Sequence, residues 1–204
     1  LSDADLSWAN LTDTNLATTN LTGIASSNIQ GIPAALPGGW LLVNGYLVGP
    51  TAYLPFTELS GANLAHISLY KTNLYGANLS GANLLGTTLE DATLVRTNLT
   101  GANLANADVT NTNLANANLT NTNLTNTNLT NAHLTGADLT NANLTEATLS
   151  NSYLTRTILI SADLSGANLT NAVLFDANLS GANLTGADLI NTDMTHTNLT
   201  NTNL

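Results

Sequence analysis

The feature that most constrains this chain is a leucine at every fifth position from Leu54 to Leu204, with only Val109 and Met194 as exceptions. A period of five fits neither the 3.6-residue period of an amphipathic helix nor the simple alternation of a strand. On a helix the leucines would be spread around the whole circumference, because five residues turn by about 500° at roughly 100° each. The pattern therefore argues against both ordinary helices and long strands.

Each five-residue unit has an internal order. The residue two before the leucine is small, mostly Ala or Thr, and a polar residue stands between the two. This short alternation places the small residue and the leucine on the same side of an extended segment. The two residues after the leucine, often with Gly or Asn second, favour a turn. Such units bury their leucines only by coiling around a common axis and stacking coil upon coil.

Units such as those at residues 60–64 (Ser-Gly-Ala-Asn-Leu) and 101–105 (Gly-Ala-Asn-Leu-Ala) resemble the pentapeptide-repeat family. The resemblance extends over nearly the whole chain. It implies an all-β fold, a right-handed, four-sided parallel β-helix with four pentapeptides in each coil. We interpret residues 1–204 as a single solenoid with N-terminal repeats in 1–31, a non-repeat insert in 32–53 and uninterrupted repeats in 54–204.

Composition excludes several classes of protein. Only 8% of the residues are charged, yet 13 acids against three bases give a net charge of −10. This balance argues against a nucleic-acid binder, which would carry a basic stripe. There is no cysteine and no apolar run long enough for a membrane span. The sequence starts at Leu1, in repeat phase and without an initiator Met, which favours loss of an upstream segment and an extracellular or extracytoplasmic location.

The insert, residues 32–53, contains the strongest local signal outside the repeats. Two apolar segments flank Asn44-Gly45, a pair typical of a tight β-hairpin. We interpret the insert as a hairpin or wide coil packed on the solenoid, because leaving Trp40 or Tyr46 in water would cost roughly 1.5–3 kcal/mol each. The alternative is an exposed binding loop that uses Trp40, Asn44, Gly45 and Tyr46.

Residues that are 20 positions apart in the sequence are expected to lie on neighbouring coils, so identical residues at this spacing should stack into ladders. Two asparagine ladders are expected, one at Asn111, Asn131, Asn151, Asn171 and Asn191, the other at Asn63, Asn83, Asn103, Asn123 and Asn143. Asparagine ladders stabilise stacked strands. For the inward Thr residues we expect each hydroxyl to bond to a nearby backbone group of its own turn.

Departures from the consensus gather on one predicted side. With four units per coil, we name side 1 the pentapeptides centred on Leu74, Leu94 and every twentieth residue after them; sides 2, 3 and 4 follow in chain order. An exposed apolar patch edged by arginine is typical of an interface. Random decay of the repeat is the alternative explanation. The candidate interface on side 1 and the adjacent corner is Tyr75, Val95, Arg96, His133, Tyr153, Arg156, Ile158, Ile160, Val173, Phe175 and His196.

No motif points to catalysis, a metal or a cofactor. The chain lacks a glycine-rich phosphate loop, a serine elbow and any His, Cys or carboxylate cluster with ligand spacing. His133 and His196 are expected roughly 14 Å apart, three coils of about 4.8 Å, too far to share a metal. The convex outside of a solenoid predicts no pocket. We therefore expect a protein that is not an enzyme.

Three functions remain open. The first is a structural or interaction solenoid that associates with itself end to end, into filaments, because neither end carries a capping element. The second follows from the resemblance, since some pentapeptide-repeat proteins mimic DNA and bind gyrase, and the net charge fits. The third is a Thr- and Asn-rich surface that binds ice or carbohydrate, as suggested by the outward Thr110, Thr130 and Thr170. Expected partners are therefore the protein itself, side to side or end to end, or another protein.

Overall fold

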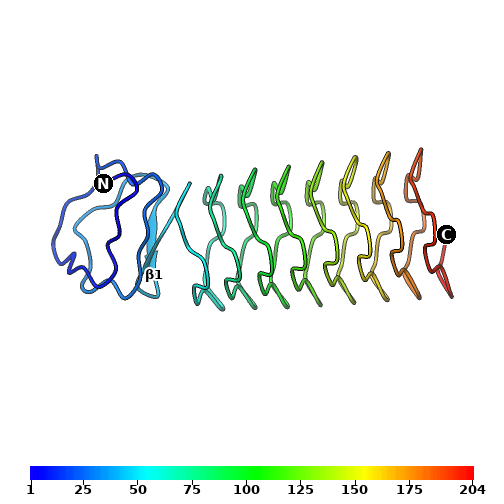
Figure 1. Cartoon of the computed structure of the whole chain (residues 1–204), viewed down its shortest axis with the longest axis horizontal. Helices are drawn as coiled ribbons and strands as arrows, with labels where there is room; N and C mark the ends of the chain where they lie inside the picture. The colour runs from blue at the N-terminus through cyan, green and yellow to red at the C-terminus, as the bar shows by residue number, and fades with distance from the viewer.

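The computed structural model describes all residues, 1–204, and they form one stack of coils (Figure 1). It contains no helix, and its only strands are β1 (Leu41–Val43) and β2 (Tyr46–Val48). No helix is therefore available that could cross a membrane. From Tyr53 onward, isolated parallel bridges join residues 20 apart, such as Asn63 and Asn83. Four pentapeptides make one coil, as the resemblance implied.

Most corners are tight turns closed by one backbone hydrogen bond. The Ala62 N–H donates to the Leu59 carbonyl at 3.1 Å, and this bond recurs around the stack. From Leu54 onward, the residue two after each central position has a positive φ, for example 65° at Gly61 and 56° at Asn111, which is the pattern of a type II turn. Gly and Asn adopt this left-handed conformation at least cost, and that explains their place in the repeat.

The leucines fill the interior and the small residues line its corners. Leucines such as Leu84 and Leu94 are fully buried. The expectation for the inward Thr hydroxyls was mostly wrong. The Thr97 hydroxyl donates to the Leu74 carbonyl at 2.8 Å, one coil earlier in the stack. The leucine carbonyl already accepts a turn N–H in its own coil, and its second lone pair receives the hydroxyl of the next coil. The local bond occurs at Thr57 and Ser152.

The asparagine before each leucine has two tasks. Its Oδ1 accepts the N–H of the residue two later, as in Thr100 N to Asn98 Oδ1 at 3.1 Å, and the Thr100 hydroxyl donates to the same oxygen at 2.7 Å. This asparagine cap explains the frequent Asn-Leu-Thr triplet. Its Nδ2 also donates along one predicted ladder, from Asn83 to Asn63, Asn103 to Asn83 and Asn123 to Asn103. The second ladder lies at the turn position two residues after the leucine, where the bonds are Asn131 to Asn111, Asn171 to Asn151 and Asn191 to Asn171. Two predicted steps, 123–143 and 131–151, carry no such bond.

The hairpin predicted at Asn44-Gly45 is present. β1 and β2 pair antiparallel with Leu42 opposite Leu47. Asn44 and Gly45 have φ values of 50° and 79°, as the type I′ hairpin turn requires. Leu47 is fully buried and Trp40 is only 8% exposed. The segment is therefore packed into the stack and is not an exposed loop.

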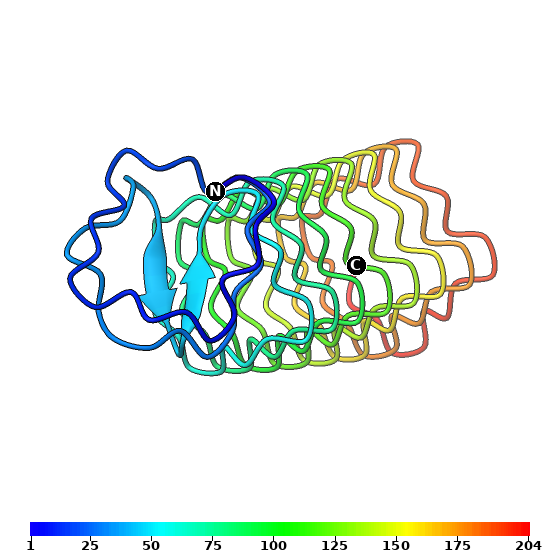
Figure 2. The same cartoon turned by 60° about the vertical axis from the view of Figure 1, so that its left-hand side comes forward.

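The hairpin tip lies between the second and third coils. Ala25 bridges to Tyr53, a step of 28 residues instead of 20, so this coil holds eight additional residues. On one side of the tip the Ile29 N–H donates to the Gly45 carbonyl at 3.0 Å. On the other side Asn44 Nδ2 donates to the Glu58 carbonyl at 3.1 Å. Figure 2 shows both strands beside the N-terminal coils.

Candidate functional site

The structure places one group of the candidate interface in a single column on side 1, in which His133 and Tyr153 are exposed and Val173 is half-buried. Parallel bridges join His133 to Tyr153 and Tyr153 to Val173, so the three side chains follow one another coil by coil. The rings of His133 and Tyr153 stack with their centroids 4.7 Å apart and an interplanar angle of 16°. Tyr153 remains 45% exposed. This column is an aromatic surface that is open to a partner.

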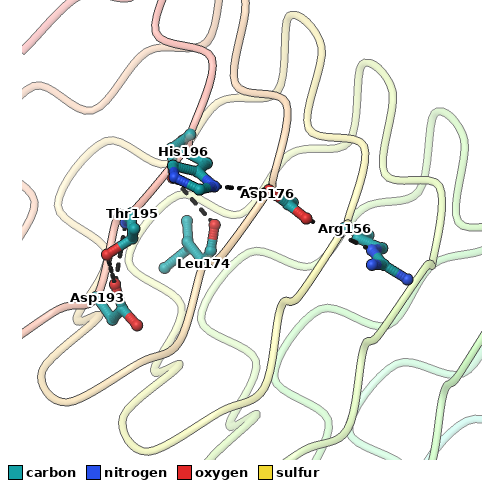
Figure 3. Close-up of polar contacts among 7 residues, drawn as sticks. Arg156, Leu174, Asp176, Asp193, Thr195 and His196 are labelled. Atoms are coloured by element: carbon teal, nitrogen blue, oxygen red, sulfur yellow. Dashed lines mark hydrogen bonds and ion pairs between the residues drawn. The ribbon is translucent and has the colours of Figure 1, made fainter.

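A charged row follows at the adjacent corner (Figure 3). The Asp176 carboxylate lies between Arg156 Nε at 3.6 Å and His196 Nδ1 at 3.4 Å. The ring of Phe175 packs beside that of His196 with the centroids 5.3 Å apart. Arg156 and His196 are exposed and Asp176 is half-buried, so these contacts contribute little stability. They place a positively charged Arg156 beside a negatively charged Asp176 at this corner.

Asp193, on the outermost coil of side 1, completes the polar part of this region (Figure 3). The Thr195 hydroxyl and then the Thr195 backbone N–H lower the pKa of the Asp193 carboxyl, and His196 adds to this effect. The bonds from Thr195 Oγ1 and N measure 2.5 and 2.9 Å. Asp193 therefore carries its negative charge over the neutral pH range.

A separate group lies near the N-terminal end of side 1. Arg96 Nη1 donates to the Tyr75 hydroxyl at 3.1 Å. The Tyr75 ring packs edge-to-face with Phe56, with the centroids 5.3 Å apart. Asn113 and Ala115 separate this group from the column at His133. The predicted residues thus form two groups and not one continuous patch.

The remaining predicted residues are less prominent. Val95 and Ile160 are half-buried, and Ile158 lies on side 2, where it bridges Asp138 and Asn178. Ile158 is 36% exposed and extends the apolar area around Tyr153 onto the next side.

Side 1 has also lost the asparagine cap in three successive coils. His133, Tyr153 and Val173 occupy the capping position, and the N–H groups two residues later have no acceptor in the protein. Asp193, in the next coil, restores the cap by accepting the Thr195 N–H. The aromatic column therefore carries uncovered backbone donors beside its rings.

One pocket opens on side 1, contrary to the expectation that a convex solenoid has none. It has a volume of about 270 Å³ and lies where the hairpin tip holds the second and third coils apart. The convexity argument holds for the regular coils and fails at this insert. The lining residues are Ser7, Ala25, Ser26, Ser27, Tyr46, Tyr53, Pro55, Phe56 and Thr57.

Sequence reasoning missed the aromatic residues around this pocket. Tyr53 is 51% exposed and Phe56 70%, and Trp8, at the same corner two coils earlier, is 71% exposed. The available signal for Trp8 and Phe56 was an aromatic residue at a turn position that mostly holds Gly, Asn or another polar residue. Of the predicted insert residues, Tyr46 lines the pocket, Asn44 and Gly45 hold the hairpin tip between the coils, and Trp40 is buried.

A sequence model of pentapeptide repeats matches eight copies, at residues 1–23, 57–96, 97–136, 137–174 and 167–204. The chain belongs to the pentapeptide-repeat family. This pentapeptide-repeat protein is similar to the crystal structure of HetL, involved in heterocyst differentiation regulation, from the cyanobacterium Nostoc sp. strain PCC 7120. The two are 30% identical over 100% of this chain and 88% of HetL, with a TM-score of 0.53.

The fold is also found in QnrB1, a plasmid-mediated fluoroquinolone resistance protein. A trypsin-treated variant of QnrB1 is 19% identical over 74% of this chain and 82% of its own, with a TM-score of 0.65. At this identity the likeness concerns the fold alone, the right-handed quadrilateral β-helix of the family. A search of curated proteins finds no match.

The side chains of this pentapeptide-repeat protein do not assemble a metal centre. Nowhere in residues 1–204 do three or more His, Cys, Asp or Glu side chains come together. Glu90 and Asp91 lie at a corner of side 4, where Asp91 Oδ2 is 3.9 Å from Lys71 Nζ and its Oδ1 accepts a bond from Asn111.

Proposed function

We propose that this pentapeptide-repeat protein is a non-catalytic interaction scaffold that associates end to end with further copies of itself. The supporting observation is the open edge of the coil formed by residues 185–204. Inside the stack each central N–H donates to the next coil, as Leu169 N does to the Asp188 carbonyl at 2.8 Å. The corresponding N–H groups of Leu189, Met194 and Leu199 have no acceptor within residues 1–204. A row of unpaired donors is a template for another chain.

The first coil exposes the complementary edge of the backbone hydrogen bonding that joins neighbouring coils. Inside the stack the residue before each leucine donates to the preceding coil, as Asn103 N does to the Ala82 carbonyl at 2.9 Å. In the first coil the N–H groups of Asp5, Asn10 and Asn15 lack that acceptor. The two edges therefore fit head to tail. A head-to-tail contact of this kind does not close on itself, so it produces filaments.

Apolar burial acts in the same direction. Leu204 is 73% exposed, Leu199 38% and Leu1 52%, whereas leucines inside the stack are fully buried. Stacking a second copy would remove these side chains from water, at a gain of about 25 cal/mol for each Å² of apolar surface.

Light scattering of residues 1–204 over a range of concentrations tests end-to-end association. The weight-average mass is expected to rise with concentration. Met194→Pro removes an edge donor and should leave a monomer, whereas the matched control Met194→Leu restores the consensus residue and should still associate. Circular dichroism confirms that both variants are folded. A native chain that stays monomeric at every concentration would contradict the proposal.

Side 1 is proposed as a second contact surface of the scaffold, between neighbouring rods or with another protein. The observations that support this second surface are the exposed Tyr153 in its column and the N–H groups beside it that have no acceptor. Tyr153→Ser combined with Phe175→Ser should shift the elution volume of side-by-side assemblies. An unchanged elution volume and unchanged recovery of bound partners would contradict this part of the proposal.

The two alternatives receive less support from the geometry. Asp138, Asp163 and Asp108 lie on sides 2, 3 and 4, so the acids do not form the continuous track that a DNA mimic needs. Gyrase supercoiling assays would detect such an activity. On side 4, the Thr110 and Thr130 hydroxyls already donate to side-chain oxygens of their own turns, at 2.6 and 2.7 Å. Their protons are therefore not free to order ice.

A further inference from the structure

We propose that the pocket between the second and third coils binds a lysine or arginine side chain from an extended segment of a partner protein. Three rings, those of Tyr46, Tyr53 and Phe56, line the pocket together with the serines at positions 7, 26 and 27. A cation is attracted to the face of an aromatic ring, and hydroxyl oxygens accept its N–H groups. The volume of about 270 Å³ is below that of most small-molecule sites and suits one long side chain.

The aromatic residues occupy positions where folding alone disfavours them. Phe56 is 70% exposed and has a φ of 56°, a left-handed conformation that is costly for a bulky residue. Trp8, at the same corner, has a φ of 66° and is 71% exposed. Elsewhere in the stack most corners hold Gly or Asn at this position, and the others hold polar or charged residues such as His66 and Lys71. Two large rings held in strained turns and in water point to a binding role.

The Phe56 ring is held in place from behind. A Cβ added to Gly76 would lie 2.8 Å from two Phe56 ring atoms, so the ring packs against the bare backbone of the next coil. Tyr75 contacts it edge-to-face, and Arg96 fixes the Tyr75 hydroxyl. The ring therefore loses little freedom when a ligand packs against it, and such preorganisation raises affinity.

Charge selects a cationic ligand. Residues 1–70 contain four acids and neither Lys nor Arg. The Asp5 carboxylate accepts the N–H of the lining residue Ser7 at 2.8 Å. The Ser7 side chain and then its N–H lower the pKa of Asp5, which is therefore charged at neutral pH. Glu58 follows the lining residue Thr57 on the third coil, and its Oε2 accepts a hydrogen bond from Asn78 Nδ2 at 2.8 Å. Negative charge on the first and third coils and the rings that line the pocket complement a basic peptide.

Titration calorimetry on the full chain tests this inference with the capped peptide Gly-Arg-Gly-Arg-Gly and its citrulline counterpart, which keeps the shape and lacks the charge. The arginine peptide is expected to bind at least tenfold more tightly than the citrulline peptide, and more weakly as salt is raised. The double variant Tyr53→Asn with Phe56→Asn should weaken binding at least tenfold. It restores consensus residues, so it keeps the fold.

Tyr153→Asn is the matched control, because it removes a ring from the same side five coils away and should leave the affinity unchanged. Equal binding of the two peptides, an unchanged affinity in the double variant, or no binding of the arginine peptide at millimolar concentration would each overturn the inference. The pocket is remote from the edge at Met194. Met194→Pro should therefore bind the peptide normally, which separates this result from the test of end-to-end association.

Discussion

Sides 1 and 3 of the solenoid have the same backbone conformation but different outward-facing residues. Both are built from parallel bridges 20 residues apart, such as Tyr153 with Val173 on side 1 and Asn103 with Asn123 on side 3. On side 3 every residue before a central leucine is Asn or Asp. These residues are Asn63, Asn83, Asn103, Asn123, Asn143, Asp163, Asn183 and Asn203. On side 1, from Tyr53 onward, only Asn73, Asn113 and Asp193 are of this kind.

The difference shows that the fold is determined inside the coil and not by the outward residue. The same buried leucines support both sides. Outward asparagines add caps and ladder bonds, and side 1 lacks many of them and displays rings instead. Because these substitutions give up local stability without altering the backbone, side 1 is where recognition is expected.

The largest predicted effect tests whether the interior of both sides is equivalent. Leu134→Ala on side 1 and Leu144→Ala on side 3 should each lower the free energy of unfolding by about 2–5 kcal/mol, because each leaves a cavity where a fully buried leucine stood. Urea unfolding followed by circular dichroism measures both. A loss confined to one side would show that the two interiors differ.

A smaller effect should distinguish the outer surfaces. Asn123→Ala on side 3 removes the bonds from Thr125 N and Oγ1 and the ladder bond to Asn103, so we expect a loss of about 1 kcal/mol. His133→Asn on side 1 should instead stabilise the chain by about 0.5–1 kcal/mol, because it supplies the missing cap for Thr135. Unfolding midpoints decide the signs, and destabilisation by His133→Asn would mean that its stacking on Tyr153 outweighs a cap.

The smallest effect depends on pH. Asp163 is the one acid among the capping residues of side 3, and the Ser165 N–H, followed by the Ser165 hydroxyl, lowers its pKa from the ordinary 3.8. A lowered folded-state pKa adds stability that is present above the unfolded value and is lost as the pH falls through the folded one. Asp163→Asn keeps a cap that does not titrate. The native chain should therefore lose more stability than the variant between about pH 5 and pH 2, and parallel pH profiles would contradict this.

The regular coils could be predicted because each five-residue unit specifies its own local conformation. A unit of five residues specifies an inward pair, an outward residue and a turn, and repetition carries that register from Leu54 to Leu204. The resemblance to pentapeptide-repeat proteins supplied the number of sides. The hairpin at Asn44-Gly45 was equally local, because its turn type depends on two residues. Of the Arg156–Asp176–His196 row, the sequence predicted Arg156 and His196 as candidate residues. It did not single out Asp176, which the structure places between them.

The sequence by itself determined the repeat, the buried leucines, the hairpin turn and the gathering of unusual residues on side 1. The tertiary structure alone decided where the hairpin docks, and with it the pocket and the alignment of Trp8 with Phe56, 48 residues apart. The eight additional residues before Tyr53 interrupt the count of 20 that assigns a residue to a side. The five-residue repeat therefore cannot predict on which side the residues before the insert lie, because the path of the insert is set by packing between coils.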